Sequence, residues 1–252
     1  MLNTATANPA PQPGAAPHTI FETRRLKAFY GRAQILFDIA LTVRRGEIVA
    51  LMGRNGAGKS TTLKAIMGLV TANAELLRFN GAEIGGLPPF RIARAGLGYV
   101  PEERRIFTDL TVYENLEIGR RAAPEGRAAW EPDRLFAIFP NLAEMKGRRA
   151  SAMSGGEQQM LTIARTLMGN PEMVLLDEPS EGLAPVIVEE MAEAVMRMKD
   201  EGIAVLLSEQ NLHFASAVSD RAVVIEKGAV RFEGTMDELA ADDAVRAAYL
   251  SV

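Results

Sequence analysis

One glycine-rich segment, IVALMGRNGAGKSTTLKAIMGL at residues 48–69, constrains the fold of this chain more than any other. An apolar run leads into the pattern Gly53-x-x-x-x-Gly58-Lys59-Ser60, and a helical pattern begins directly behind it. In such a strand–loop–helix unit the glycines let backbone amides turn inward around a phosphate, and the helix N-terminus adds its positive end. We therefore predict a phosphate-binding loop. Its residues are Gly53, Arg54, Asn55, Gly56, Ala57, Gly58, Lys59, Ser60 and Thr61.

Two side chains of this loop indicate a nucleoside triphosphate with Mg²⁺. The ammonium group of Lys59 supplies a point charge to the β- and γ-phosphates, and the Ser60 hydroxyl can ligate the metal ion. The simpler alternative is a glycine turn with an incidental lysine. The position of the motif directly between a strand and a helix favours the phosphate loop.

An acidic pair follows a second apolar run, in MVLLDEP at residues 173–179. Asp177 ends this predicted strand, where its carboxylate can hold Mg²⁺ through water. Glu178 comes next and is our candidate for positioning or deprotonating the attacking water. The alternative is a helix-capping aspartate with a solvated glutamate beside it, which the presence of the phosphate loop disfavours.

Strands alternate with helices along the chain, which predicts an α/β fold with a parallel sheet. We expect strands at Ile35–Val43, Glu47–Met52, Leu97–Val100, Met173–Leu176, Ile203–Leu207 and Ala222–Ile225, and a hairpin in NAELLRFNGAEI with a type I′ turn at Asn80-Gly81. The runs EMVLLD and IAVLL are continuously apolar, as in strands buried on both faces. The spacing Ile187, Met191, Val195, Met198 predicts the core face of a helix that ends at Gly202. The middle of the chain, about residues 85–165, lacks good strand patterns after Val100 and is expected to be mostly helical, with a loop-like interruption at GRRAAPEGRAAWEPDR.

Composition limits the classes of function. The chain of 252 residues carries a formal net charge of −4, which argues against nonspecific binding to nucleic acid or to an anionic membrane. It has no cysteine, hence no disulfide framework and no thiolate metal site. No apolar run approaches the roughly 18 residues that a membrane span needs. Residues 1–17, MLNTATANPAPQPGAAP, lack the features of a secretory signal and are interpreted as a disordered Ala/Pro-rich tail. We therefore expect a soluble, cytoplasmic protein.

A second candidate anion site lies in MSGGEQQMLTIARTLMGN, residues 153–170. Ser154 is a good helix N-cap, and Glu157 stands three positions later, as in a capping box. The segment is explained equally by a well-capped helix alone. However, the glycines at 155 and 156 are costly at a helix start unless something approaches the backbone closely. Two helix N-termini prepared for phosphate suggest a nucleotide held between two chains.

Together and in this order, GRNGAGKST, SGGEQQ and LLDEP resemble the motifs of an ATP-binding-cassette (ABC) ATPase, over about residues 18–252. The resemblance implies an α/β P-loop NTPase cassette with a RecA-like core, an antiparallel β subdomain and an inserted helical subdomain at about 85–165. It also implies that two cassettes pair head to tail, so that the signature segment of one closes over ATP bound by the other. The residues that would act in trans are Ser154, Gly155, Gly156, Glu157 and Gln158. Tyr30 matches the aromatic residue that stacks on adenine.

Departures from the general pattern narrow the resemblance. Glu102 replaces the usual glutamine ahead of the helical subdomain, Gln210 replaces the switch histidine, and Asn211 replaces the following aspartate. With PSEGLAP and the closing AVRAAYL, these features resemble the shorter ATP-binding subunit of branched-chain amino acid importers. That resemblance implies a distinct, longer cassette as partner, two integral-membrane permeases docked near Glu102–Leu116, a periplasmic binding protein, and a position on the cytoplasmic face of the inner membrane.

Other functions remain open at this stage. The cassette of a urea or short-amide importer is the nearest alternative, although its loop more often keeps glutamine. Lipopolysaccharide-export cassettes normally retain the switch histidine. A soluble ABC ATPase of DNA repair or the ribosome typically carries two cassettes or long insertions, and a P-loop kinase or GTPase has no use for SGGEQ.

Two residue roles follow as hypotheses from these departures. Glu102 is a candidate Mg²⁺-side ligand beside Ser60 and Asp177, and its charge should repel Asp177 and Glu178 unless the metal is present. Gln210 can donate a hydrogen bond to the γ-phosphate but cannot hold a proton near neutral pH. The alternative γ-phosphate sensor is His213, one turn into the following helix.

Overall fold

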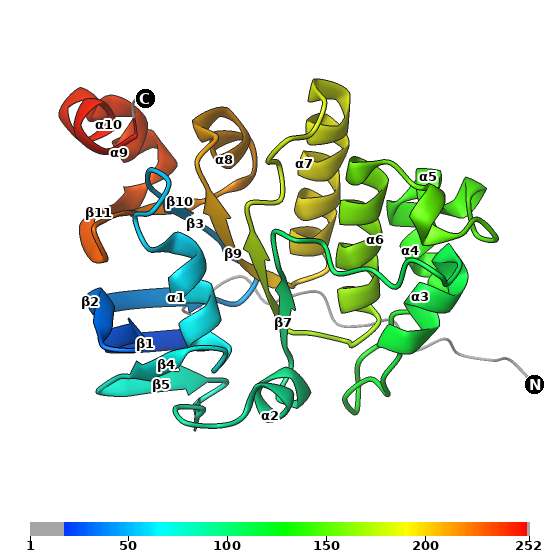
Figure 1. The fold of residues 1–252 in the computed structure, drawn as a ribbon, viewed down its shortest axis with the longest axis horizontal. Helices are drawn as coiled ribbons and strands as arrows, with labels where there is room; N and C mark the ends of the chain where they lie inside the picture. Colours follow the sequence, from blue (N-terminus) through cyan, green and yellow to red (C-terminus); the bar gives the residue numbers. More distant parts are fainter. Residues whose placement is uncertain (1–17, 251–252) are drawn as a thin grey trace, which may run out of the picture.

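The computed structural model describes residues 18–250, so the interpretation of residues 1–17 as a tail lies outside the described residues. Within them, two β-sheets and a group of helices lie side by side (Figure 1). The antiparallel sheet stands at one end of the molecule, and helices α3 (Val112–Gly119), α4 (Pro132–Ile138) and α5 (Pro140–Glu144) stand at the other.

The larger sheet has six strands in the order β11-β10-β3-β9-β8-β7. Their bounds are β3 Ile48–Met52, β7 Leu97–Val100, β8 Met173–Asp177, β9 Ala204–Glu209, β10 Arg221–Glu226 and β11 Ala229–Thr235. All neighbours are parallel except β10 and β11. Every residue of β3, β8 and β9 is buried, which confirms that the continuous apolar runs are strands covered on both faces.

The antiparallel sheet contains β1 (Thr19–Tyr30), β2 (Ala33–Arg44), β4 (Thr71–Asn73), β5 (Leu76–Phe79) and β6 (Ala82–Glu83). Between β5 and β6, Asn80 and Gly81 both have positive φ, 50° and 75°, as the predicted type I′ turn requires. Strand β1 was not predicted. Its pairing with β2 has register shifts on both sides of Leu26, and Arg25 has a φ of 51°. Its apolar residues therefore do not alternate regularly.

The remaining helices are α1 (Lys59–Ile66), α2 (Pro89–Arg94), α6 (Gly155–Leu167), α7 (Pro185–Asp200), α8 (Leu212–Val218), α9 (Met236–Ala241) and α10 (Asp243–Tyr249), with a short 3₁₀ helix at Ala150–Ala152. In α7, Met191, Val195 and Met198 are buried, which confirms the predicted core face. Gly202 has a φ of 78° and donates its N–H to the carbonyl of Lys199 at 2.8 Å, as a helix-ending glycine does.

The segment between β7 and β8 is mostly helical, as expected, and it forms one core with one face of the larger sheet. Trp130, which had no interpretation from the sequence, is buried in that core and its backbone N–H donates to Asn170 Oδ1 at 2.8 Å. Strand β7 falls inside the range 85–165 but pairs with β8 in the larger sheet. The division of the chain into subdomains stays a prediction.

Candidate nucleotide site

Three neighbouring strands bring the predicted site residues to one edge of the larger sheet. β3, β9 and β8 are adjacent and parallel, and ligands of such sheets bind outside the carboxyl ends of the strands. The phosphate loop follows β3, Asp177 ends β8 with Glu178 beside it, and Gln210 follows β9. The topology therefore explains why segments far apart in the sequence meet here.

The phosphate loop requires glycine at two positions for packing. Gly53 has a φ of 153°, and a Cβ there would lie 2.4 Å from the carbonyl oxygen of Ile225. Gly58 has a φ of 111°, and a Cβ there would lie 2.9 Å from Leu36 Cδ2. Gly56 also has positive φ, but nothing lies within 4 Å of its added Cβ. Gly56 therefore faces open space, on the side where a phosphate is expected.

Lys59 is the first residue of α1 and is only 4% exposed. Its Nζ donates to the carbonyl oxygens of Gly53 at 2.8 Å and Arg54 at 3.3 Å. The same Nζ lies 2.9 Å from Glu178 Oε1, in a buried ion pair. The lysine and the acidic residue predicted to act on ATP are therefore partners of each other in the structure.

Glu178 is 8% exposed and has a positive φ of 48°. Burial raises the pKa of Glu178 above its ordinary value, although the Lys59 ammonium acts in the opposite direction. A carboxylate with a raised pKa accepts a proton from water more readily, which suits a residue that activates the attacking water.

Asp177 is 1% exposed, and its two oxygens differ in their partners. The Tyr99 hydroxyl donates to Oδ2 at 3.1 Å, while Oδ1 is buried without a hydrogen-bond partner. Burial, followed by the charge of Asp177, raises the pKa of the Tyr99 hydroxyl, so Tyr99 stays a neutral donor. The helix-capping alternative for Asp177 does not apply, because this side chain caps no helix.

The donor set fits a Mg²⁺ ion that arrives with the nucleotide. Among residues 18–250, no cluster of three or more His, Cys, Asp or Glu side chains could hold a metal by itself. The orphaned Oδ1 of buried Asp177 is an acceptor that a cation would satisfy, and Ser60 offers a hydroxyl at the start of α1. When bound, the ion would neutralise charge on the β- and γ-phosphate oxygens.

A cavity of about 470 Å³ lies over the phosphate loop. Its lining includes Tyr30, Glu102, Glu178 and Glu181 besides the loop itself. Tyr30 is 49% exposed, at the end of β1, which leaves its ring accessible to a base. Burial and the neighbouring carboxylates Glu181 and Asp177 raise the pKa of Glu102. The predicted repulsion is therefore found for Asp177 but not for Glu178, and its largest source is Glu181, which was not predicted.

The signature segment begins α6 and does not line this cavity. Ser154 forms the predicted capping box. Its N–H donates to Glu157 Oε2 at 2.6 Å, and its Oγ accepts from Glu157 N at 3.3 Å. Gln158 turns inward and donates to the carbonyl of Met153 at 3.1 Å.

Both signature glycines have close neighbours within the same chain. A Cβ at Gly155 would lie 2.5 Å from Arg104 Nη1, and a Cβ at Gly156 would lie 2.5 Å from Ile187 Cγ2. Packing against Ile187 therefore accounts for glycine at 156, whereas the mobile guanidinium end of Arg104 could move away from a side chain at 155. Contact with a nucleotide in trans stays a prediction.

The described fold and site agree with known proteins over most of the chain. The family model described as "ABC transporter" matches residues 36–181. This chain belongs to the ABC transporter family. It is 43% identical to the high-affinity branched-chain amino acid transport ATP-binding protein BraG of Pseudomonas aeruginosa, over 90% of this chain and 97% of that protein. It is 35% identical to the lipopolysaccharide export system ATP-binding protein LptB of Haemophilus influenzae, over 92% of this chain and 97% of that protein. A solved "ATP binding subunit of ABC transporter" superposes on the structure with a TM-score of 0.77 and is 31% identical in sequence, covering 92% of this chain and 96% of that one.

These matches confirm the predicted fold and the class of activity. The chain is a nucleotide-binding ABC ATPase subunit of a transporter. No helix within residues 18–250 is long and apolar enough to cross a membrane.

Gln210 and His213 of the cassette lie beside the nucleotide cavity rather than in it. Both line an adjoining cavity of about 620 Å³, which shares Glu178 and Glu181 with the first. Gln210 is half-buried and directly follows β9, whereas His213 is exposed. Asn211 caps α8, its Oδ1 accepting from Phe214 N at 3.1 Å. Because Gln210 directly follows β9, its position favours Gln210 over His213 as the γ-phosphate sensor. That role stays a prediction.

Several residues of the cassette site were not singled out from the sequence. Tyr99 is the third residue of a strand, and only the alignment of β7 beside β8 brings its hydroxyl to Asp177. Glu181 lines both cavities from the loop behind Glu178. Glu209 lies two residues beyond the strand predicted at Ile203–Leu207, but it is the last residue of β9 and is 1% exposed. A charged residue that ends an apolar strand was the available signal.

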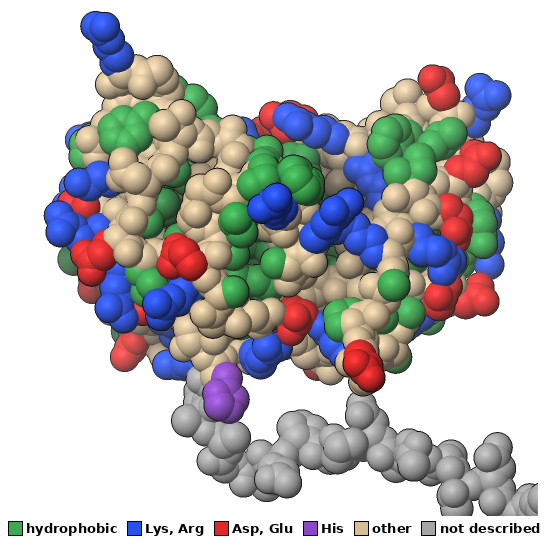
Figure 2. Space-filling model, turned by 90° about the horizontal axis from the view of Figure 1, so that it is seen from below, with side chains coloured by type: hydrophobic (Ala, Val, Ile, Leu, Met, Phe, Trp, Pro, Cys, Tyr) green, Lys and Arg blue, Asp and Glu red, His purple; other side chains and the backbone are tan. Residues whose placement is uncertain are grey.

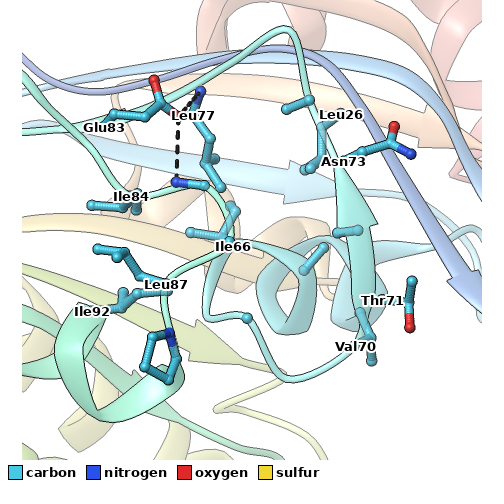
Figure 3. A pocket seen from close by; sticks show the side chains of 17 residues that line it. Leu26, Ile66, Val70, Thr71, Asn73, Leu77, Glu83, Ile84, Leu87 and Ile92 are labelled. Atoms are coloured by element: carbon cyan, nitrogen blue, oxygen red, sulfur yellow. Dashed lines mark hydrogen bonds between the residues drawn. The ribbon is translucent and has the colours of Figure 1, made fainter.

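Another cavity of about 620 Å³ lies apart from the nucleotide site (Figure 3). Its walls are apolar side chains, among them Leu26, Ile66 and Ile92, and the Glu83 carboxylate at its edge accepts from the Leu77 backbone N–H. It shares no lining residue with the cavity over the phosphate loop, so the cassette's chemistry does not extend into it.

Proposed function

We propose that this cassette is the motor subunit of a branched-chain amino acid importer. The observation that carries the proposal is the 43% identity to BraG over 90% of the chain. The glutamate at 102 and the SEQN segment at 208–211, which replaces the switch histidine, support the same subfamily by resemblance. The 35% identity to LptB makes a lipopolysaccharide-export cassette the second candidate.

The catalytic cycle that we propose begins with the Lys59–Glu178 ion pair. When MgATP binds, the Lys59 ammonium pairs with the β- and γ-phosphates instead of with Glu178. The Glu178 carboxylate is then free to accept a proton from the attacking water. Ser60 and Asp177, with Glu102 at the cavity edge, would hold the Mg²⁺ that accompanies ATP. Gln210 donates to the γ-phosphate. Hydrolysis then reopens the closed dimer.

The partner cassette is proposed to be a distinct, longer paralogue paired head to tail. Ser154–Gln158 would close over the ATP of that partner, because this segment is the N-terminus of α6, where the helix dipole is positive, and it does not line the cavity over its own phosphate loop. The complex would stand on the cytoplasmic face of the inner membrane, with a periplasmic binding protein on the far side.

The permeases are proposed to dock in a groove beside α2 and α3. Four of the large hydrophobic side chains that are about half exposed line it: Leu69, Phe90, Phe107 and Ile118. Arg105, Arg121 and Arg165 line the same groove, and no acidic residue does. Figure 2, seen from below, shows hydrophobic side chains bordered by Lys and Arg in the middle of one face. Such a patch on an acidic protein fits an apolar segment of a partner.

Reconstitution tests this function. The cassette is coexpressed with candidate permeases and a candidate longer cassette from the same organism, and the complex is placed in proteoliposomes with a candidate binding protein. We expect ATP-dependent uptake of radiolabelled leucine, abolished by Glu178→Gln. Uptake of urea but not leucine would assign the chain to the short-amide importers, and copurification with lipopolysaccharide-extracting subunits would favour the second candidate.

A further inference from the structure

A buried carboxylate joins the two loops that carry Glu178 and Gln210. Glu209 is 1% exposed at the end of β9. Its Oε1 accepts the backbone N–H of Ser180 at 3.1 Å, and its Oε2 accepts those of Gln210 and Asn211, each at 3.1 Å. One side chain therefore bonds the loop after β8 through one oxygen and the loop after β9 through the other.

These backbone amides and the side chain of Ser180 take the place of water around the Glu209 charge. No lysine, arginine or histidine within residues 18–250 forms an ion pair with this carboxylate. Burial raises the pKa of Glu209, and the hydrogen bonds from Ser180, Asn211 and Gln210 oppose that shift. A buried carboxylate is costly unless it is hydrogen-bonded, so the position of each loop is tied to this group.

The two loops are also joined through their backbones. The N–H of Glu178 donates to the carbonyl of Ser208 at 3.0 Å, one residue before Glu209. Ser180 is two residues beyond Glu178, and Gln210 is the neighbour of Glu209. A shift of the backbone at Gln210 is therefore passed to the Glu178 loop through two connections. One is the backbone hydrogen bond from Glu178 to Ser208, and the other is the Glu209 side chain.

We propose that Glu209 is a positioning residue that couples the contact of Gln210 with the γ-phosphate to the placement of Glu178. The proposal rests on the roles given above to Gln210 and Glu178. Glu209 itself touches neither nucleotide nor water in the reaction; it makes the two loops move as one unit. In its absence each loop would settle separately, and the γ-phosphate contact would no longer hold Glu178 against the attacking water.

A carboxylate suits this task better than an amide. Its two oxygens both accept, so one can face each loop. A glutamine at 209 has a single acceptor oxygen, and its NH₂ group would face a backbone N–H. Glu209→Gln therefore keeps the side chain's shape but disconnects one of the two loops.

The first test is steady-state ATP hydrolysis by the full chain in its transporter complex. We expect Glu209→Gln to lower kcat about tenfold while KM for ATP stays within about twofold, because a charge-assisted bond is lost without a change in the phosphate loop. The matched control is Glu189→Gln, an exposed carboxylate that lines the same cavity as Gln210 and should leave kcat unchanged. An unchanged kcat in Glu209→Gln, or a rise in KM that accounts for the loss, overturns the proposal.

A double variant separates coupling from general structural damage. If Glu209 acts through Gln210, then Glu209→Gln/Gln210→Ala should be no more than about twofold slower than the slower single variant. Rate losses that multiply, or a Gln210→Ala variant with wild-type kcat, overturn the proposal. The ATP hydrolysis rates do not depend on which solute is carried, so they remain decisive even if leucine uptake fails.

Amide hydrogen exchange on the unmodified chain keeps the proposal testable if the variants fold poorly. The backbone amides of Ser180 and Gln210 should have equal protection factors, and the exchange rates of both should fall by the same factor when MgATP is added. A Ser180 amide that exchanges freely while that of Gln210 is protected would contradict the coupling.

Discussion

Removing the ammonium of Lys59 should destabilise the nucleotide-free cassette, because Glu178 is then a buried carboxylate without a cation. Losing one partner of a buried pair typically costs about 3–5 kcal/mol in unfolding free energy. Protonation of Glu178, whose ordinary pKa is 4.5, limits this loss. Protonating a carboxylate costs about 1.4 kcal/mol for each pH unit above its pKa, so protonating Glu178 at pH 7 costs about 3.5 kcal/mol. The unpaired charge can therefore lower the unfolding free energy by at most about 3.5 kcal/mol at pH 7.

The pH dependence has a defined sign. Without Lys59, burial is the largest influence on the pKa of Glu178 and raises it, so the folded state binds the proton more tightly than the unfolded state. Stability is then lost as pH rises from 4.5 through that raised pKa, and it is recovered on acidification. At pH 5.5 the limit falls to about 1.4 kcal/mol.

Urea unfolding without nucleotide, followed by the fluorescence of the single tryptophan, Trp130, measures these differences. We expect Lys59→Ala to lose about 3 kcal/mol at pH 7 and less than half of that at pH 5.5. The double variant Lys59→Ala/Glu178→Gln should recover most of the loss, since no charge remains to be compensated. Equal losses in the single and double variants at both pH values would refute the reasoning.

Three further predictions concern other contacts of the cassette. Gly156→Ala should lose about 1–3 kcal/mol of unfolding free energy to the 2.5 Å clash with Ile187. Ile187→Ala should relieve that clash in the double variant, and additive losses would contradict this. Glu102→Gln should raise the Mg²⁺ concentration for half-maximal ATPase severalfold, and an identical Mg²⁺ titration would sink the metal role. Gln210→Ala should lower kcat about tenfold or more while His213→Ala changes it less than about twofold, and the reverse ranking would make His213 the sensor.

The elements predicted well from the sequence are those that local patterns determine. The phosphate loop needs only glycines between a strand and a helix, and the apolar run ending at Asp177 needs only burial on both faces. Strand β1 was missed because its bulges near Arg25 break the alternation of buried and exposed residues, on which strand prediction depends.

The contacts that could not be predicted join segments far apart in the chain. The Lys59–Glu178 ion pair, the bond from Tyr99 to Asp177 and the approach of Ile187 to Gly156 all depend on the order of strands in the larger sheet and on the packing of α6 against α7. At least one residue of each pair was predicted from the sequence. Which residue lies opposite it could not be predicted, because local patterns do not show how distant segments align.

The Glu178→Gln variant tests the central claim most directly, since Glu178 is both the proposed base for water and the partner of Lys59. Equilibrium binding of MgATP and single-turnover release of phosphate are measured on the same preparation, with Glu189→Gln as the control. We predict binding as tight as in the unmodified chain or tighter, because Lys59 no longer has a charged partner to give up, together with hydrolysis slowed about 100-fold or more. Phosphate release near the unmodified rate would contradict the assignment of Glu178 and the mechanism built on it.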